Sequence, residues 1–376
     1  MTNPITKLRR LGQSVWLDDL SRGLITSGEL ARMVRRGEVT GVTSNPTIFE
    51  QAVARSDDYL PDIIRLSRSG LGPGEIYEAL VIEDIRAAAD LLRPVYEATG
   101  GADGYVSLEV DPGLAYDPAG TIAQALRLWR RVDRPNLMIK IPGTRPGMAA
   151  ITEAVAAGIN VNVTLLFAVD RYLEAADAYL RGLERRLAAG EPVDRVASVA
   201  SFFVSRVDTK VDRRLQALMG AGGEAAARAG GLLGRAAVAN ARLAYRRYLE
   251  LIESPRFRRL EGRGARRQRL LWASTSTKNP NYSDVKYVEE LVLPETVTTL
   301  PRPTLRAFLD HGRAEPVGPE ALAEAERVPV ALAELGIDLG QVMAELEAEG
   351  VAAFRRSFEA LIGAVAERQP LAGPVS

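Results

Sequence analysis

The chain of 376 residues contains no cysteine and a single histidine, His311. The lack of cysteine excludes disulfides, thiolate metal sites and cysteine nucleophiles. One histidine excludes any site that needs two, such as the HExxH zinc site. A serine–histidine–aspartate triad would have to use His311, which lies in a polar helical stretch and is better interpreted as a surface side chain. Any catalysis must therefore use lysine, carboxylate, hydroxyl or amide side chains. We expect neither a metal nor a cofactor.

Charge of one sign is not in excess, and long hydrophobic runs are missing. The 48 basic and 48 acidic residues give a formal net charge of zero, which does not favour nucleic acid or an anionic membrane as a partner. No apolar run reaches 18 residues, so we expect no transmembrane helix. Residues 1–16 lack the apolar core of a signal peptide. We therefore expect a cytoplasmic monomer or homodimer that acts on small molecules.

Lysine is scarce, which makes Lys140 informative. Only five of the 48 basic residues are lysine, and Lys140 lies in the apolar run 136–144, where a Pro-Gly pair ends a buried strand. Lysine is rarely buried unless it is paired or functional. A desolvated lysine, unlike arginine, can lose its proton and become an amine nucleophile. The alternative is a lysine at a strand end that extends its ammonium group to solvent, and the run alone does not decide between them.

Short apolar runs alternate with amphipathic helical segments. This alternation is typical of a parallel sheet, because parallel neighbours need long crossovers. Eight such units predict an α/β fold of the (β/α)8 TIM-type barrel class, and no GxGxxG motif follows the first strand to suggest a dinucleotide-binding fold. The predicted strands are 13–18, 41–45, 104–110, 136–142, 160–166, 197–204, 269–275 and 296–300. The predicted helices are 27–36, 74–98, 118–132, 145–157, 169–189, a long region 206–253, 283–290 and 303–311.

Two regions exceed a minimal barrel, and we expect both to belong to one domain that spans residues 1–376. Residues 207–265 are rich in alanine, arginine and glycine, and they predict an insertion of helices around a flexible loop after the sixth strand. Residues 313–376 contain helical patterns at 317–334 and 338–367. They predict a C-terminal helical extension.

Polar side chains occur at alternate positions near the carboxyl ends of seven strands. Alternate side chains of a barrel strand point inward, and active sites of such barrels lie at the carboxyl ends of the strands. Burying so many polar groups would cost about 1–3 kcal/mol for each one left unpaired, although a structural network could satisfy one or two pairs. The predicted inward-facing residues are Trp16, Asp18, Thr43, Asn45, Ser107, Glu109, Met138, Lys140, Asn162, Thr164, Ser201, Phe203 and Ser205, with Ser274 and Thr275 at the end of the seventh strand.

These residue types support Schiff-base chemistry. A neutral Lys140 amine attacks a ketone or aldehyde and loses water, and the protonated imine then draws electrons from an adjacent carbon–carbon bond. Glu109 is suitably placed to deliver a proton to the departing hydroxyl, through water and Thr164. Asp18 is the candidate base for the hydroxyl of the leaving aldehyde. Two carboxylates beside one lysine need different environments if their roles are to differ.

Six segments, in this order, resemble the transaldolase family, specifically its longer bacterial type. As an ordered set they are highly specific, whereas TSNPT or SxEVD alone would not be. The segments are VWLDD at 15–19, GVTSNPTI at 41–48, SLEVDP at 107–112, MIKIPGT at 138–144, GINVNVTLLF at 158–167 and SFFVSRVD at 201–208.

The resemblance implies a class I aldolase fold and a reaction. That reaction transfers a dihydroxyacetone unit from sedoheptulose 7-phosphate to glyceraldehyde 3-phosphate, giving erythrose 4-phosphate and fructose 6-phosphate in the non-oxidative pentose phosphate pathway. By this resemblance Lys140 is the Schiff-base lysine, and Asp18 is the acid/base for carbon–carbon cleavage. Glu109 and Thr164 match the pair that holds the catalytic water.

The resemblance also implies a set of substrate-binding residues. Asn45, Asn162 and Ser201 match the residues that bind the dihydroxyacetone part. Phe203 matches an aromatic residue of the pocket, and Arg206 matches a phosphate-binding arginine.

One departure from the family pattern concerns a second phosphate-binding arginine after the seventh strand. Here the chain reads ASTSTKNP over residues 273–280. Lys278 is expected to supply the charge, as a point charge in place of a bidentate fork, with Ser274 on the same segment. Asp19 follows Asp18 directly, and both strand alternation and the family pattern favour Asp18 as the catalytic carboxylate.

Two other functions stay open. Fructose-6-phosphate and deoxyribose-phosphate aldolases also use a barrel lysine, but those chains are generally compact, and they release free dihydroxyacetone or acetaldehyde without an acceptor. A barrel that only binds sugar phosphates would keep Arg206 but would not need Lys140 between two carboxylates. A Lys140→Arg variant that kept its biological role would favour this binding function.

Overall fold

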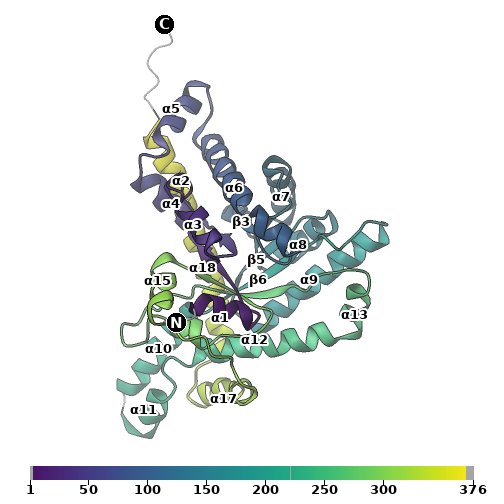
Figure 1. Ribbon diagram of the computed structural model, residues 1–376. Coiled ribbons are helices and arrows are strands. Elements are labelled where there is room, and N and C mark those ends of the chain that lie inside the picture. The colour runs from purple at the N-terminus through teal and green to yellow at the C-terminus, as the bar shows by residue number, and fades with distance from the viewer. Residues whose placement is uncertain (1–2, 221, 370–376) are drawn as a thin grey trace.

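Eight parallel strands close into a barrel in chain order in the computed structural model, which describes residues 3–220 and 222–369 (Figure 1). Each strand pairs with its neighbours in sequence, and β1 pairs with β8. The strands are β1 (Ser14–Asp18), β2 (Gly41–Thr43), β3 (Val106–Glu109), β4 (Leu137–Pro142), β5 (Val161–Leu166), β6 (Ser198–Phe203), β7 (Arg269–Ala273) and β8 (Val297–Leu300). The predicted (β/α)8 fold is confirmed, and each strand lies within its predicted run.

The strands read as nearly continuous apolar runs because both faces of the barrel wall are covered. Every residue of β3, β4, β5 and β6 is buried. Parallel strands packed between an inner core and outer helices need apolar side chains on both faces. Polar residues within these runs are therefore buried, and apolar packing does not explain their presence.

Helices follow the strands and surround the barrel. They are α1 (Pro4–Arg10) before β1, α2 (Arg22–Thr26) and α3 (Glu29–Arg35) after β1, α4 (Pro46–Arg55), α5 (Leu60–Arg68) and α6 (Pro73–Ala98) after β2, the 3₁₀ turn η1 (Pro112–Leu114) and α7 (Pro118–Val132) after β3, α8 (Gly147–Ala156) after β4, α9 (Val169–Ala188) after β5, α14 (Lys286–Glu289) after β7 and α15 (Arg302–His311) after β8.

Helices α1, α2, α4 and α5 were not predicted, and the helix predicted at 27–36 begins two residues later, at Glu29 of α3. The start of α4 is nevertheless well marked. The Asn45 side chain accepts a hydrogen bond from the Ile48 amide (3.0 Å), and Pro46 occupies the first helical position. Asparagine caps and first-turn prolines are strong helix-start signals, so this helix was predictable from Asn-Pro.

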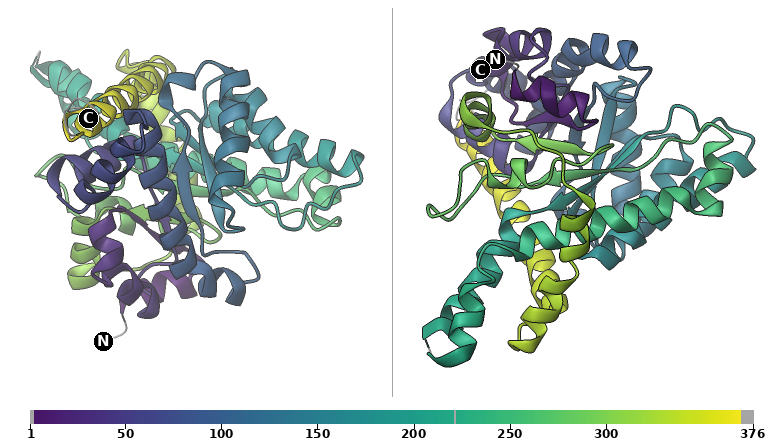
Figure 2. Two further views of the ribbon diagram at one scale, coloured as in Figure 1. Left: turned by 90° about the horizontal axis from the view of Figure 1, so that it is seen from above. Right: turned by 60° about the horizontal axis from the view of Figure 1, so that its bottom comes forward.

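The two predicted additions pack against each other. The insertion after β6 consists of α10 (Ser205–Gly220), α11 (Gly223–Gly230), α12 (Ala236–Glu253) and α13 (Pro255–Glu261). Its glycine-rich loop includes residue 221, which lies outside the described residues. The extension consists of α16 (Pro319–Glu324), α17 (Arg327–Glu334) and α18 (Leu339–Glu367). Helix α12 contacts α16 and α17, Arg235 pairs with Glu324 (2.8 Å), and α11 and α17 project from the same end of the molecule (Figures 1 and 2).

Helix α18 crosses the carboxyl end of the barrel. It contacts α4, α6, η1 and α10, as well as β5 (Figure 1). Helices α4 and α10 and the η1 turn all begin where a strand ends, so a helix that touches all three lies over the mouth where barrel active sites form. The extension therefore covers the carboxyl end of the barrel.

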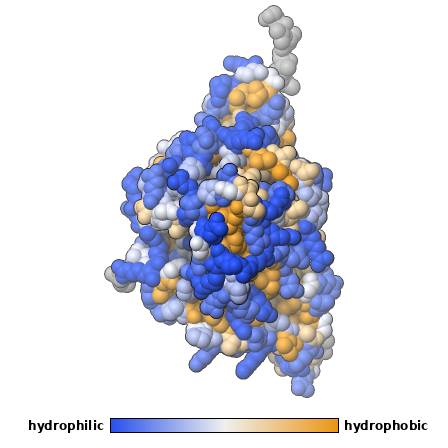
Figure 3. All heavy atoms as spheres, turned by 90° about the vertical axis from the view of Figure 1, so that its right-hand side faces the viewer, coloured by the Kyte–Doolittle hydropathy of each residue, from blue (hydrophilic) through white to orange (hydrophobic). Residues whose placement is uncertain are grey.

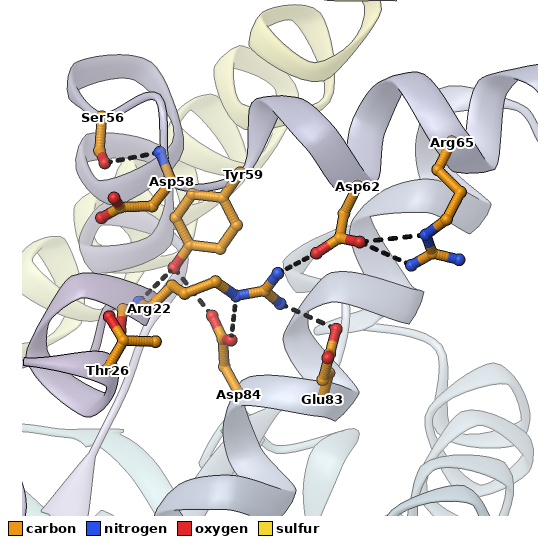
Figure 4. Close-up of polar contacts among 9 residues, drawn as sticks. All are labelled: Arg22, Thr26, Ser56, Asp58, Tyr59, Asp62, Arg65, Glu83 and Asp84. Carbon is orange, nitrogen blue, oxygen red and sulfur yellow. Dashed lines mark hydrogen bonds and ion pairs between the residues drawn. The ribbon is translucent and has the colours of Figure 1, made fainter.

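A partly buried ionic network around the buried Asp84 holds the segment that follows β1 (Figure 4). Arg22 of α2 donates to Asp84 of α6 (Nε to Oδ1, 2.9 Å) and pairs with Asp62 of α5. The Tyr59 hydroxyl donates to Asp84 (2.8 Å) and accepts a hydrogen bond from the Arg22 amide (2.9 Å). Burial raises the pKa of Asp84, and Arg22 opposes that rise. Because a buried charge is tolerated only when it is paired, the network holds α2 against α5 and α6.

The face in Figure 3 shows mostly hydrophilic residues with smaller hydrophobic areas. Among the described residues, no helix has both the length and the apolar character needed to cross a membrane.

Gly41 is a sensitive position for stability. A Cβ at Gly41 would lie 2.5 Å from Cε2 of Trp16. Trp16 is fully buried, and its Nε1 donates to Asp103 (2.7 Å), so the indole cannot move away. We expect Gly41→Ala to lower the free energy of unfolding by about 1–3 kcal/mol through overpacking, measured by chemical denaturation.

Gly74→Ala is the matched control for Gly41→Ala. A Cβ at Gly74 in α6 meets nothing within 4 Å, so its expected effect is neutral or stabilising. Equal losses for the two variants would contradict the close packing of Gly41 on Trp16.

Candidate active site

A cavity of about 260 Å³ lies at the carboxyl end of the barrel, beneath α18. Its walls come from β1, β2, β4, β6, β7 and β8, from the segment after β7, and from helices α4, α10 and α18. It adjoins a polar groove of about 570 Å³, with which it shares Asp18, Ile48, Gln51 and Pro301. The predicted site residues that line the cavity are Asp18, Asn45, Lys140, Ser201, Phe203, Arg206, Ser274 and Lys278.

Lys140 is buried at the floor of this cavity. Its side chain is only 5% exposed, and Nζ lies 3.2 Å from Glu109 Oε2. Nζ also donates a hydrogen bond to the Ser44 carbonyl (3.1 Å). These contacts contradict the alternative in which the ammonium group extends to solvent.

Glu109 lies beside Lys140 on the neighbouring strand, because β3 and β4 pair Glu109 with Lys140. Burial raises the pKa of Glu109 to about 7, although Lys140 opposes the rise, and Asp18 adds to it. Oε1 of Glu109 has no hydrogen-bond partner among the residues that the structure describes. Near neutral pH the carboxyl group is therefore close to the balance between its charged and neutral forms, as a proton donor requires.

Asp18 faces the same cavity from β1. Thr43 Oγ1 donates to its Oδ1 (2.7 Å). Burial raises the pKa of Asp18, while Lys140 and the hydrogen bond from Thr43 lower it. Asp19 instead pairs with Arg302 (Oδ2 to Nε, 2.5 Å) and lines the adjoining groove. Asp18, and not Asp19, therefore lines the cavity.

Asn162 and Thr164 of β5 are fully buried and do not line the cavity itself. Ser201 Oγ donates to Asn162 Oδ1 (2.6 Å), and Asn162 Nδ2 donates to Ser107 Oγ (3.0 Å). The pairing of β4 with β5 places Asn162 next to Lys140. Thr164 Oγ1 has no hydrogen-bond partner within the described part of the chain, so it keeps both donor and acceptor capacity.

Two strand ends have left-handed backbone conformations. Leu165 at the end of β5 has φ 60°, and Ser274 after β7 has φ 54°. The pairing of β5 with β6 shifts register at the same place, between Val163 and Leu166. Such conformations cost roughly 1–3 kcal/mol in a non-glycine residue and often mark functional sites. Here they break the strand alternation at the mouth, and the Ser274 hydroxyl lies 2.9 Å from the Ser205 hydroxyl.

Arg206 and Lys278 bring two cations to the cavity. The Arg206 guanidinium lies over the Phe203 ring (5.3 Å from Cζ to the centroid). Lys278 Nζ donates to Ser276 Oγ (2.5 Å). Burial and the charge of Arg206 both lower the pKa of Lys278. Two partly desolvated cations that repel each other form a favourable site for an anion.

Several cavity residues were not predicted, and two of them, Thr299 and Phe354, contact predicted residues. The hydroxyl of Thr299 in β8 lies 2.7 Å from the hydroxyl of Thr43. Thr298 and Thr299 are adjacent and point to opposite faces of β8, so the sequence does not show which of them faces the cavity. Phe354 of α18 places its ring 5.6 Å from Lys140 Nζ and 5.9 Å from Arg206 Cζ. No local sequence signal marks Phe354, because only tertiary packing decides which face of α18 meets the barrel.

No group of three or more His, Cys, Asp or Glu side chains in residues 3–220 and 222–369 is arranged to hold a metal ion. His311 is half-exposed, and its ring contacts Asp284 and Asp310, as expected of a surface side chain.

Comparison with known proteins identifies the family. The family model described as Transaldolase/Fructose-6-phosphate aldolase matches residues 15–365. The chain belongs to this family. It is 51% identical over 359 residues to a transaldolase of Saccharopolyspora erythraea, covering 95% of each chain. It is 50% identical over 362 residues to a transaldolase of Thiobacillus denitrificans, covering 96% of this chain and 99% of the relative. A transaldolase of Frankia alni is 49% identical over 370 residues, with 98% of each chain covered. These matches assign the chain to the transaldolase enzymes of the family.

The charges around Glu109 give a testable pKa pattern. Lys140→Met removes the opposite charge that favours the carboxylate, so the pKa of Glu109 should rise above 7. Asp18→Asn removes a like charge, so that pKa should fall below its wild-type value. The pKa of Glu109 in each variant is measured by infrared titration of the C=O band of the protonated carboxyl group. The band is assigned to Glu109 by its loss in Glu109→Gln. Shifts in the same direction would contradict the arrangement of the three groups.

Proposed function

We propose that the chain is a transaldolase that acts through a Schiff base on Lys140. It transfers a dihydroxyacetone unit from sedoheptulose 7-phosphate to glyceraldehyde 3-phosphate, giving erythrose 4-phosphate and fructose 6-phosphate, in the non-oxidative pentose phosphate pathway. The supporting observation is the buried Lys140 at the floor of the cavity. Its Nζ lies 3.2 Å from Glu109 Oε2, and its charge lowers the pKa of Asp18. The same cavity contains the cations Arg206 and Lys278. The expected cytoplasmic location and a single domain over residues 1–376 belong to the same proposal.

Imine formation begins with a proton shift within the buried pair. Moving the proton from Lys140 to Glu109 turns an ion pair into a neutral amine and a neutral acid, a form that burial favours. The amine nitrogen attacks the ketone carbon of the donor sugar, and one of its protons passes to the carbonyl oxygen. The hydroxyl so formed leaves as water after it takes a second proton from Glu109, which gives the protonated imine. Thr164 is proposed to hold this water together with Glu109.

Carbon–carbon cleavage follows with Asp18 as the base. Asp18 takes the proton of the hydroxyl on the carbon that becomes the aldehyde. The electrons of the adjacent carbon–carbon bond move into the protonated imine and give an enamine on Lys140, and the aldose phosphate leaves. The reverse steps join the enamine to the acceptor aldehyde, with Asp18 returning the proton.

The remaining polar residues bind the substrate in this proposal. Asn45, Asn162 and Ser201 hold the hydroxyls of the dihydroxyacetone unit, and Phe203 packs against it. At the other end, Arg206 and Lys278 bind the phosphate, with the Ser274 hydroxyl beside them. A phosphate dianion would offset the repulsion that lowers the pKa of Lys278.

Trapping the imine tests this function directly. With fructose 6-phosphate and borohydride, we expect a reduced dihydroxyacetone adduct on the peptide that contains Lys140, detected by mass spectrometry. Lys140→Arg should lose the adduct and reduce transfer to erythrose 4-phosphate by roughly 1,000-fold or more, because arginine cannot form the imine.

Lys7→Arg is the control for this substitution, because Lys7 forms an exposed ion pair with Glu315 and does not line the cavity. Free dihydroxyacetone as the main product, without an acceptor, would indicate an aldolase. No adduct on Lys140 would contradict the Schiff base and favour a protein that only binds sugar phosphates.

Lys278→Met should raise KM for both phosphorylated donors by about 10- to 100-fold, since a charge-assisted hydrogen bond contributes about 1.5–3 kcal/mol. Adduct formation at saturating donor should persist. Lys286→Met is the matched control, because Lys286 pairs with Glu290 and does not line the cavity. KM is measured by steady-state kinetics. An unchanged KM in Lys278→Met would show that Lys278 does not bind the phosphate.

A further inference from the structure

The two cations of the cavity come from different segments of the chain, and one helix holds both. Arg206 belongs to the first turn of α10, whereas Lys278 lies in the segment after β7. Three contacts between side-chain oxygens join that segment to α10. They are Ser274 with Ser205 (2.9 Å), Tyr282 with Asp212 (2.7 Å) and Tyr287 with Asp208 (2.9 Å). Helix α10 therefore carries one cation and anchors the segment that carries the other.

The position of Lys278 depends on the loop around it. Lys278 is an exposed residue, so packing alone does not fix its ammonium group, and Nζ donates only two residues back, to Ser276. The loop is closed by a hydrogen bond from Thr277 Oγ1 to the Ser283 carbonyl (2.8 Å). Lys278 lies inside this closed loop, residues 277–283. Whatever holds the loop against the barrel therefore also places Lys278.

Tyr282 holds this loop by both its ring and its hydroxyl. The hydroxyl donates to Asp212 Oδ2 (2.7 Å), and Asp212 is buried (5% exposed). The other carboxylate oxygen of Asp212 accepts a hydrogen bond from the Gly234 amide (2.9 Å). The Tyr282 ring lies so close to Gly234 that a Cβ there would be 2.7 Å from Cζ of the ring. The loop is thus fixed to α10 and to the turn before α12.

We propose that Tyr282 is a positioning residue that sets Lys278 beside Arg206 for binding of the substrate phosphate. This inference rests on the phosphate site proposed above. The two cations repel each other, so before phosphate binds, Lys278 stays near Arg206 only if its loop is held. Hydrogen bonds to a carboxylate are among the strong ones, and the bond from Tyr282 to Asp212 supplies this hold. A site that is already assembled binds phosphate without the cost of ordering the loop.

Tyr282→Phe in the full-length protein tests this role, because it removes the hydroxyl and keeps the ring. We expect the KM for fructose 6-phosphate to rise by about three- to tenfold with kcat within about twofold of the wild type, because the loop is loosened while the groups around Lys140 stay in place. The dissociation constant of glucitol 6-phosphate, measured by titration calorimetry, should rise by a similar factor. This ligand has no carbonyl group, so it reports phosphate binding without imine formation.

A double variant shows whether the effect acts through Lys278. In Tyr282→Phe combined with Lys278→Met, the dissociation constant should stay within about twofold of that of Lys278→Met alone, because no ammonium group is left to position. Tyr248→Phe is the matched control. Its hydroxyl also donates to a carboxylate, that of Glu295 (2.9 Å), and Tyr248 does not line the cavity, so its dissociation constant should match the wild type.

An unchanged dissociation constant in Tyr282→Phe, or a further rise in the double variant, would overturn the positioning role. An equal rise in Tyr248→Phe would overturn it as well, because the loss of any buried tyrosine hydroxyl would then have the same effect. Unweakened binding in Lys278→Met would contradict both the phosphate site and the role of Tyr282. A wild-type protein without a borohydride adduct on Lys140 would instead contradict the Schiff-base function, while calorimetry still decides the role of Tyr282.

Discussion

The buried pair of Lys140 and Glu109 is the constraint on which the rest of the site depends. Either charge alone inside the barrel would be strongly destabilising, and even together they remain poorly solvated. The parallel pairing of β3 and β4 holds them side by side, and burial keeps the pKa of Glu109 near 7. Asp18 stands in a different environment, fixed by Thr43. The two carboxylates can therefore perform different proton transfers around one amine.

The barrel supplies this chemistry, while the added helices supply its surroundings. The insertion begins with Arg206 in the first turn of α10, and the extension returns α18 over the mouth with Phe354. The two additions also contact each other through α12, α16 and α17. The parts of the chain that exceed a minimal barrel thus form one wall and one cover of the cavity.

The sequence was most informative where a side chain contradicted its surroundings. Lysine in an apolar strand and alternate polar residues in β5 predicted an interior site, because strand geometry leaves only two directions for each side chain. That rule also separated Asp18 from Asp19. It failed at Leu165, where a left-handed residue breaks the alternation, and it gave no information on Phe354. The direction of a helical side chain depends on how the whole helix packs, which no local pattern determines.

The position of Phe354 in the chain orders events during synthesis. All eight strands precede it, and N-terminal parts of a protein emerge from the ribosome and begin to fold first. The barrel with Lys140, Glu109 and Asp18 can thus close while α18 is still unsynthesised. A nascent chain can place Lys140 beside Glu109 before it acquires the helix that covers them, so the closed cavity is the last part of the site to form.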